Sequence, residues 1–220
     1  IHACATHLVS WKSLATFMSE STQARALREV SLASQSPRRK QLLEGLGLQV
    51  VVVQSTYVEE SSNNDAHEPS EVALRHALGK AQQASKSGPP VLIAADTIVE
   101  IDGEMLGKPR SAEEAAVMLR KLSGREHRVY TGFTVVDRSS GEKESGVEST
   151  VVRFSTLSDA DIASYIATGD PLDKAGAYGI QGRAGMLVSS IDGDFYTVMG
   201  LPLARIGVVL RELGYDVWAP

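Results

Sequence analysis

The segment that most constrains the fold is residues 30–40, where an apolar run passes through a polar turn directly into a helical pattern. Ser36 is a good N-cap and Pro37 a natural first helical residue, because the N–H that proline lacks would have no intrahelical partner there. The leucines of residues 42–46 recur with helical spacing, and Gly47 stops the pattern. A strand that leads straight into a helix is typical of α/β proteins.

The same segment has the composition of an anion site. The free N–H groups and the positive dipole end of a helix N-terminus favour a bound anion. Arg38 and Arg39 can each hold two phosphate oxygens, and Ser34 and Ser36 add hydroxyl groups. The glycines and the Gly-Lys-Ser/Thr ending of a Walker loop are absent. The segment therefore predicts a phosphate cradle of another kind.

Strand and helix patterns alternate along the rest of the chain. The predicted strands are residues 48–53, 91–95, 98–101, 105–107, 127–137, 147–154 and 186–191, and the predicted helices are residues 70–85, 111–123, 158–166 and 202–213. The β-branched run at 48–53 is predicted to be a buried strand. Asp102-Gly103 predicts a hairpin turn, and Ser111 and Ser158 are predicted helix caps. The alternation, interrupted by two hairpins, favours an α/β fold with a mixed sheet.

Composition narrows the class of protein. The 220 residues can bury one core, as a single domain or as two lobes that share a cleft. A net charge of −5 argues against a nucleic-acid binder, and no apolar run reaches the roughly 20 residues that span a bilayer. A single cysteine, Cys4, excludes an intrachain disulfide and favours a reducing, cytoplasmic location. Residues 1–29 are expected to form an N-terminal extension, with a targeting segment as the alternative.

Two groups of acids follow predicted strands. Asp96 comes directly after five apolar residues, so we expect it at the carboxyl end of a core strand, where α/β sheets place ligands. With a divalent cation it could bind or deprotonate water, whereas the alternative is a turn-capping aspartate. Glu59 and Glu60 are adjacent and point in opposite directions on a strand, so only one would face a shared site. A metal role and a solvated loop margin both remain open for them.

Basic and glycine-rich segments complete the candidate chemistry. Lys80 lies beside the apolar stripe of its helix, and Lys108 lies in a fixed turn before a proline. Glycines in residues 174–182 allow a ligand to approach the backbone closely, and the Gln181 amide can read a nucleobase edge. The five histidines lack metal-ligand spacing, so none is assigned a role. Together these features favour an enzyme that acts on a phosphorylated small molecule.

Five ordered motifs then carry a resemblance. They are Ser-Gln-Ser-Pro-Arg-Arg at 34–39, Ala-Asp-Thr at 95–97, Gly-Lys-Pro at 107–109, Lys-Ala-Gly-Ala-Tyr-Gly-Ile-Gln-Gly at 174–182 and Met-Gly-Leu-Pro at 199–202. From about Ser31 onward the chain resembles the Maf (septum-formation protein) family of nucleoside triphosphate pyrophosphatases. The resemblance implies one Maf-like domain over residues 30–220. Its fold would be an elongated mixed β-sheet flanked by helices, with two lobes and a central cleft, similar to the inosine triphosphate pyrophosphatase superfamily.

The resemblance also implies an activity and roles for residues. It implies metal-dependent cleavage (Mg²⁺, Mn²⁺ or Co²⁺) between the α- and β-phosphates, and the 176–182 motif is similar to the subfamily that prefers dTTP and UTP. Asp96 would accept the proton of the attacking water and bind the metal with Glu60. The implied cationic catalytic residues are Arg39, Lys80 and Lys108, and the implied substrate-binding residues are Ser34, Ser36, Arg38, Thr97 and Gln181. A homodimer is the implied assembly.

Two other functions remain open. A covalent phosphatase would use Asp96 as its nucleophile, but residue 98 is isoleucine where such enzymes carry a second aspartate. A nucleotide-binding regulator of cell division with little catalysis would need the cradle but not the acid. The first product and the turnover of bound nucleotide distinguish these alternatives.

Overall fold

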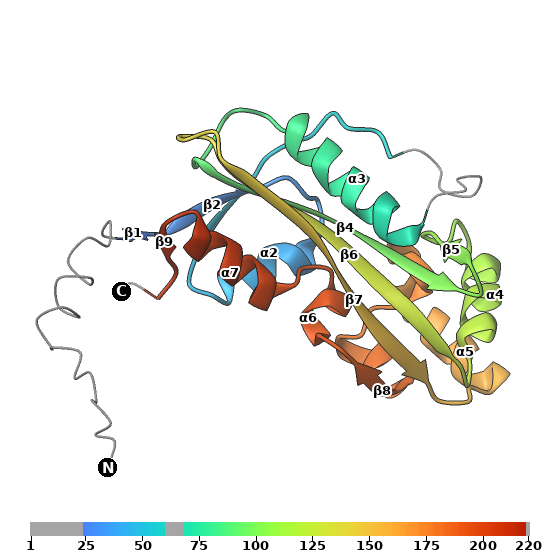
Figure 1. Cartoon of the computed structure of the whole chain (residues 1–220). Helices are drawn as coiled ribbons and strands as arrows, with labels where there is room; N and C mark the ends of the chain where they lie inside the picture. The colour runs from blue at the N-terminus through green and yellow to red at the C-terminus, as the bar shows by residue number, and fades with distance from the viewer. Residues whose placement is uncertain (1–23, 60–67, 219–220) are drawn as a thin grey trace, which may run out of the picture.

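The computed structural model describes residues 24–59 and 68–218, which form a seven-stranded mixed sheet with helices on both faces (Figure 1). The sheet strands run in the order β3-β2-β4-β6-β7-β8, and β5 pairs with β4. The strands are β1 (Arg25–Ala26), β2 (Glu29–Leu32), β3 (Gln49–Val52), β4 (Val91–Ile101), β5 (Glu104–Leu106), β6 (Glu126–Asp137), β7 (Lys143–Phe154), β8 (Val188–Asp192) and β9 (Tyr215–Asp216). β2 is parallel to β3 and β4, and the other pairs in this sheet are antiparallel. The predicted α/β class with a mixed sheet is confirmed.

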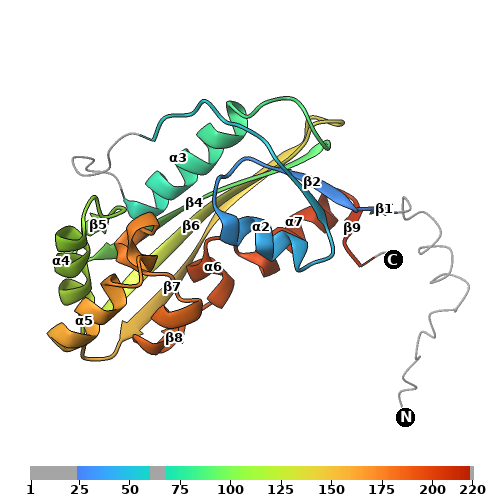
Figure 2. The same ribbon diagram turned by 180° about the vertical axis from the view of Figure 1, so that it is seen from behind.

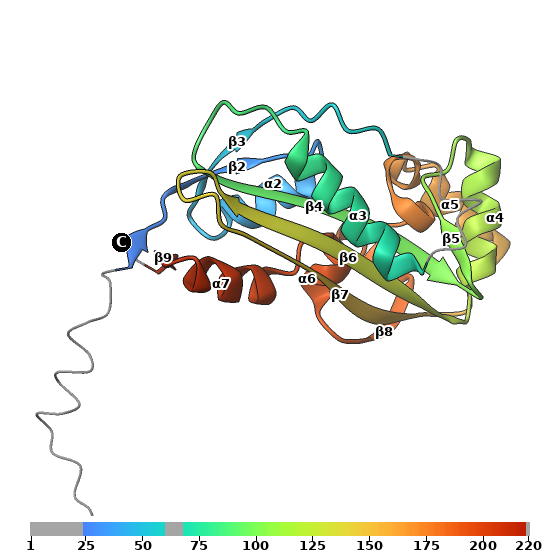
Figure 3. The same ribbon diagram turned by 45° about the horizontal axis from the view of Figure 1, so that its top comes forward.

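Helices cover the two faces of the sheet unequally. The α-helices are α2 (Pro37–Glu44), α3 (Pro69–Gln82), α4 (Ala112–Leu122), α5 (Asp159–Ile166), α6 (Phe195–Met199) and α7 (Leu203–Glu212), and the 3₁₀ turns are η2 (Asp170–Asp173), η3 (Ala175–Ala177) and η4 (Gly182–Met186). α3 lies along β4 and β6 on one face (Figure 3). α2, α6 and α7 lie on the opposite face (Figure 2). Both faces of the central strands are therefore buried, as their apolar sequences require.

Elements with strong local signals form where the sequence predicts them. Ser111 accepts a hydrogen bond from the first turn of α4, and Ser158 forms a reciprocal capping box with Asp161 at α5. Asp102 and Gly103 have φ values of 55° and 78°, the left-handed pair that a tight β4–β5 hairpin needs. Short-range chemistry therefore fixes these three boundaries.

The prediction of a buried strand at residues 48–53 is wrong. β3 lies at one edge of the sheet and, among the strands of the described residues, pairs only with β2. Leu48 and Val53 at its ends are buried, but Val51 and Val52 are 42% and 41% exposed. A β-branched run indicates a strand without telling whether a further strand covers it.

The expectation that Asp96 ends its strand is also wrong, because β4 continues to Ile101. Asp96 is the sixth residue of this 11-residue strand and lies opposite Gly132 of β6. On the other side of β4, parallel pairing with β2 reaches only Ile93. Asp96 therefore lies in mid-strand, beyond the end of the neighbouring parallel strand.

The two ends of the described chain are joined. β1 pairs in parallel with β9, although its residues fall within the predicted extension. The Arg25 guanidinium donates to Asp137 Oδ2 at 2.7 Å, and the Tyr215 hydroxyl donates to the same oxygen at 2.9 Å. Residues 1–23 of the extension lie outside the described part. Among the described residues, no helix combines the length and the apolar character needed to cross a membrane.

The buried Asp137 carboxylate should contribute measurably to the free energy of unfolding. Burial alone would raise its pKa, but hydrogen bonds from Arg25, Ser139, Ser140 and Tyr215 outweigh it and lower the pKa to about 2. Asp137→Asn should lower the free energy of unfolding at pH 7 by about 2–3 kcal/mol in urea denaturation. Because the folded pKa lies below the unfolded one, the difference should persist above about pH 4 and vanish as the pH falls toward 2.

The exposed Asp192 in β8 provides the control for this measurement. Asp192→Asn should change the unfolding free energy by less than about 0.5 kcal/mol at any pH in that range. An Asp137→Asn protein as stable as the wild type at pH 7 would contradict the proposed joining of the chain ends.

Candidate active site

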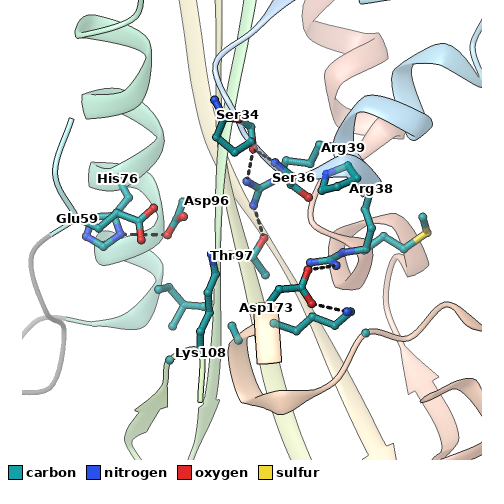
Figure 4. A pocket seen from close by; sticks show the side chains of 18 of the residues that line it. Ser34, Ser36, Arg38, Arg39, Glu59, His76, Asp96, Thr97, Lys108 and Asp173 are labelled. Atoms are coloured by element: carbon teal, nitrogen blue, oxygen red, sulfur yellow. Dashed lines mark hydrogen bonds and ion pairs between the residues drawn. The ribbon is translucent and has the colours of Figure 1, made fainter. Parts of the chain in front are cut away.

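A cavity of about 690 Å³ opens between the N-terminal end of α2 and the face of α3 (Figure 4). Its size is in the range of small-molecule sites. Five cationic side chains line it, namely Arg38, Arg39, Lys80, Lys108 and Lys174, together with the acids Glu59, Asp96 and Asp173. Ser34, Ser36, Thr97 and Gln181 also line it, so every predicted site residue in the described part of the chain lies in this cavity.

On the α2 side, Arg39 is held rigidly within the protein. Its Nε donates to the Gly200 carbonyl at 2.7 Å, Nη1 to Ser34 Oγ at 2.9 Å and Nη2 to Thr97 Oγ1 at 2.9 Å. Burial lowers the pKa of this guanidinium, against the opposing charge of Asp96, but an arginine stays protonated. Arg39 therefore joins α2, β4 and the α6–α7 connection, with two N–H groups left over for a ligand.

The N-terminus of α2 is open toward the cavity. Pro37 begins the helix after Ser36, as predicted, but the Ser36 side chain makes no capping hydrogen bond. Ser34 Oγ instead accepts the Ser36 backbone N–H at 3.2 Å. Within residues 24–59 and 68–218, the first N–H groups of α2 therefore have no side-chain acceptor, which is the arrangement that binds anions.

On the α3 side, Asp96 is surrounded by donors. Its Oδ1 accepts from Lys80 Nζ at 2.6 Å, and its Oδ2 lies 3.0 Å from His76 Nδ1. Lys80 also contacts Glu59 Oε1 at 2.5 Å. Burial would raise the pKa of Asp96, but the His76 hydrogen bond and the charges of Lys80 and Arg39 hold it below its usual value. Asp96 is therefore a buried, ionised carboxylate.

Two glycines allow this arrangement. A Cβ on Gly132, opposite Asp96 in β6, would lie 2.2 Å from the Ala73 carbonyl oxygen of α3. A Cβ on Gly79 would lie 2.2 Å from the Tyr57 ring. The missing side chain of Gly132 lets α3 approach the sheet closely enough for His76 and Lys80 to reach Asp96, and that of Gly79 makes room for the Tyr57 ring against α3.

His76 is the residue that sequence reasoning missed. The spacing of the histidines lacks a metal-ligand pattern, so it predicts no role for His76. The available signal was its position on α3 four residues before Lys80, beside the apolar residues Val72 and Ala73, since such residues share one helical face. That signal needed the location of Asp96, which only the tertiary structure supplies.

The other predicted residues differ in how many of their polar groups already contact other residues of the protein. Thr131 donates to the Thr197 carbonyl at 2.7 Å, so Thr97 must donate its hydroxyl hydrogen to Thr131 while accepting from Arg39. The Thr97 hydroxyl is therefore already used in two hydrogen bonds within the protein. Arg38 contacts Asp173 at 3.5 Å, on the wall facing α3 (Figure 4). Lys108 is exposed and makes no ion pair with any residue that the structure describes.

The glycine-rich segment is an anchored part of the cavity wall. Tyr178 and Ile180 are buried, and the Tyr178 hydroxyl lies 2.7 Å from His127 Nε2. Burial lowers the pKa of His127 to about 4, so this histidine is neutral near pH 7. Gln181 remains exposed next to these anchors and lines the cavity.

Glu59 is the acid that the structure places beside Asp96. Glu59, His76 and Asp96 each offer one possible metal-ligand atom, and these three atoms lie within 4.8 Å of one another. The predicted metal ligand Glu60 lies outside the described residues, so that assignment stays a prediction. Oxygen ligands from two carboxylates suit Mg²⁺ or Mn²⁺.

Comparison with known proteins agrees with the motifs. The profile of the Maf-like protein family matches residues 29–213. The chain belongs to this family. A dTTP/UTP pyrophosphatase of Methanosarcina mazei is 46% identical over 196 residues, which cover 87% of this chain and 98% of that protein. A dTTP/UTP pyrophosphatase of Alkaliphilus oremlandii is 48% identical over 188 residues, covering 84% and 96%.

The close approach of α3 to this Maf-like sheet can be tested at Gly132. Gly132→Ala should lower the free energy of unfolding by at least about 1–3 kcal/mol, because the new methyl group meets backbone atoms that cannot rotate away. Urea denaturation measures the change. The control is Gly207→Ala in α7, where a new Cβ would lie 3.9 Å from Arg211 Nη1. That variant should gain up to about 1 kcal/mol from helix propensity, and equal effects at both glycines would contradict the argument.

Proposed function

We propose that this chain is a metal-dependent nucleoside triphosphate pyrophosphatase that hydrolyses dTTP and UTP to the monophosphate and pyrophosphate. The printed names of its relatives support the substrate class. The observation that carries the proposal is one cavity with an open helix N-terminus and cations on one wall and the ionised Asp96 on the other. This arrangement suits a triphosphate that is attacked by water.

In this proposal the cationic wall binds the phosphates. The α2 N-terminus and the arginines 38 and 39 hold the triphosphate, and Lys108 approaches from the exposed side. Water adds to the α-phosphorus, the bond to the β-phosphate oxygen breaks, and pyrophosphate leaves. Asp96 accepts the proton of the attacking water. Negative charge grows on the phosphate oxygens, so fixed cations lower the barrier without covalent catalysis.

The carboxylates next to Lys80 fit a divalent cation. Glu59 and Asp96 already converge on one positive charge, the Lys80 ammonium. A bound Mg²⁺, Mn²⁺ or Co²⁺ would neutralise phosphate charge and lower the pKa of water. The low pKa of Asp96 makes it a weak base on its own, and that property favours this assistance. Lys80 would then have to leave the carboxylates and is free to pair with phosphate oxygens.

Base selection is assigned to Gln181 and Arg38, which both line the cavity. The Gln181 amide can donate to and accept from the paired polar groups of a pyrimidine edge, and Arg38 lies on a wall of the same cavity. The resemblance further supports a homodimer in the cytoplasm. Sedimentation equilibrium tests the assembly, with a single monomer mass contradicting it.

The role of Asp96 gives the first functional prediction. Asp96→Asn keeps the size of the side chain but removes its charge, and should lower pyrophosphate release from dTTP by about 10²–10⁴-fold. A coupled assay of pyrophosphate and orthophosphate measures it. Wild-type turnover in the variant would reject the proposed base. Orthophosphate as the first product would favour a covalent phosphatase, and tight nucleotide binding without turnover in the wild type would favour a regulator.

The second prediction separates Lys80 from Lys108, two of the cavity lysines. Lys80→Met should tighten Mn²⁺ binding in the absence of nucleotide by about three- to tenfold, because it removes the ammonium that occupies the carboxylates. Lys108→Met removes the same charge from the same cavity but from a side chain that makes no ion pair with Glu59 or Asp96. It should leave Mn²⁺ affinity unchanged. Titration calorimetry measures both. Unchanged or weaker binding in Lys80→Met would contradict competition between Lys80 and the metal.

A further inference from the structure

His76 lies on the cavity face of α3 and is nearly inaccessible, with 2% exposure. Its Nδ1 is 3.0 Å from Asp96 Oδ2. Lys80, one helical turn later, donates to the other oxygen, Oδ1. Helix α3 therefore holds both oxygens of a carboxylate that belongs to β4.

The chemistry of the pair fixes the direction of the hydrogen bond. An ionised carboxylate can only accept, so Nδ1 must carry the hydrogen. The other ring nitrogen, Nε2, is buried and has no hydrogen-bond partner in residues 24–59 and 68–218. The hydrogen bond to Asp96 is thus the one polar contact of this ring within the described part of the chain.

The two contacts of Asp96 differ in how readily they can change. Lys80 is a flexible side chain that lines the cavity and is shared with Glu59. The His76 ring is enclosed, with the Tyr57 ring 5.8 Å away at a tilted angle. Ligand entry can displace the lysine, whereas the buried histidine ring is kept away from solvent and ligand.

We propose that His76 is a positioning residue for Asp96: its Nδ1–H fixes Oδ2, so that Oδ1 keeps facing the place now held by Lys80. This inference rests on the proposed function, in which Oδ1 meets the attacking water or the metal. Without the histidine hydrogen bond, the carboxylate could rotate about its Cβ–Cγ bond and turn its reactive oxygen away.

A direct metal role for His76 is the competing assignment. One of its ring nitrogens belongs to a group of possible ligand atoms, shared with Glu59 and Asp96, that lie within 4.8 Å of one another. Nδ1 cannot donate its hydrogen to Asp96 and bind a metal through a lone pair at the same time, so at this nitrogen the two roles exclude each other. The two assignments therefore predict different outcomes for metal binding.

The test compares two substitutions at this position. His76→Leu fills the space without a donor, and His76→Asn places an amide N–H close to the position of Nδ1. We expect His76→Leu to lower kcat for dTTP by about 10–100-fold with little change in KM, and His76→Asn to recover most of that loss. Mn²⁺ affinity, measured by calorimetry, should stay within about threefold of the wild type in both variants.

A matched control accounts for simple destabilisation. Val72→Ala creates a cavity on the same buried face of α3 without removing any contact to Asp96. It should lower the melting temperature and leave kcat unchanged. The proposal is overturned if His76→Leu keeps wild-type kcat, if folded His76→Asn is as slow as His76→Leu, or if both variants lose Mn²⁺ affinity together.

A second measurement needs no substrate. In ¹⁵N NMR of the wild type, His76 Nδ1 should have the shift of a protonated nitrogen, and its hydrogen resonance should move in Asp96→Ala. A bare Nδ1 with a protonated Nε2 would overturn the proposal even if the protein turns over no nucleotide. If the wild type releases no pyrophosphate but the NMR result is as expected, the proposed function fails and the hydrogen bond stands.

Discussion

The close contact between α3 and β6 at Gly132 is the constraint on which the site depends. It brings the helix near enough for His76 and Lys80 to reach a carboxylate in the middle of β4. An ionised carboxylate in that position would be unstable without such partners, since an unpaired buried charge is costly. The close packing of α3 against β6 therefore also determines that Asp96 can stay ionised in mid-strand.

The two walls of the cavity differ in how their charged groups are paired. The wall formed by α2 is positive and open, with Arg39 fixed by three hydrogen bonds and the helix N-terminus uncapped. The wall formed by α3 pairs its charges internally through Lys80. A polyanion can bind the α2 wall directly. On the α3 wall, a metal ion would have to replace the Lys80 ammonium on the carboxylates.

Local chemistry explains what the sequence could predict. Caps such as Ser111 and Ser158 and the Asp102-Gly103 turn act within four residues, and their elements form as expected. The predicted cavity residues also converge, because ordered motifs imply a known arrangement. What failed depends on distant partners: the edge position of β3, the extension of β4 through Asp96 by pairing with β6, and the meeting of His76 with Asp96.

The length of the central strands has a mechanical consequence. β4, β6 and β7 span 11, 12 and 12 residues and pair with one another almost throughout, so both cavity walls rest on one continuous sheet (Figure 1). A hinge between the walls would have to bend three hydrogen-bonded strands together. These strands therefore resist a large hinge opening of the cavity, and the sheet sets the distance between the phosphate-binding wall and Asp96 before a substrate binds.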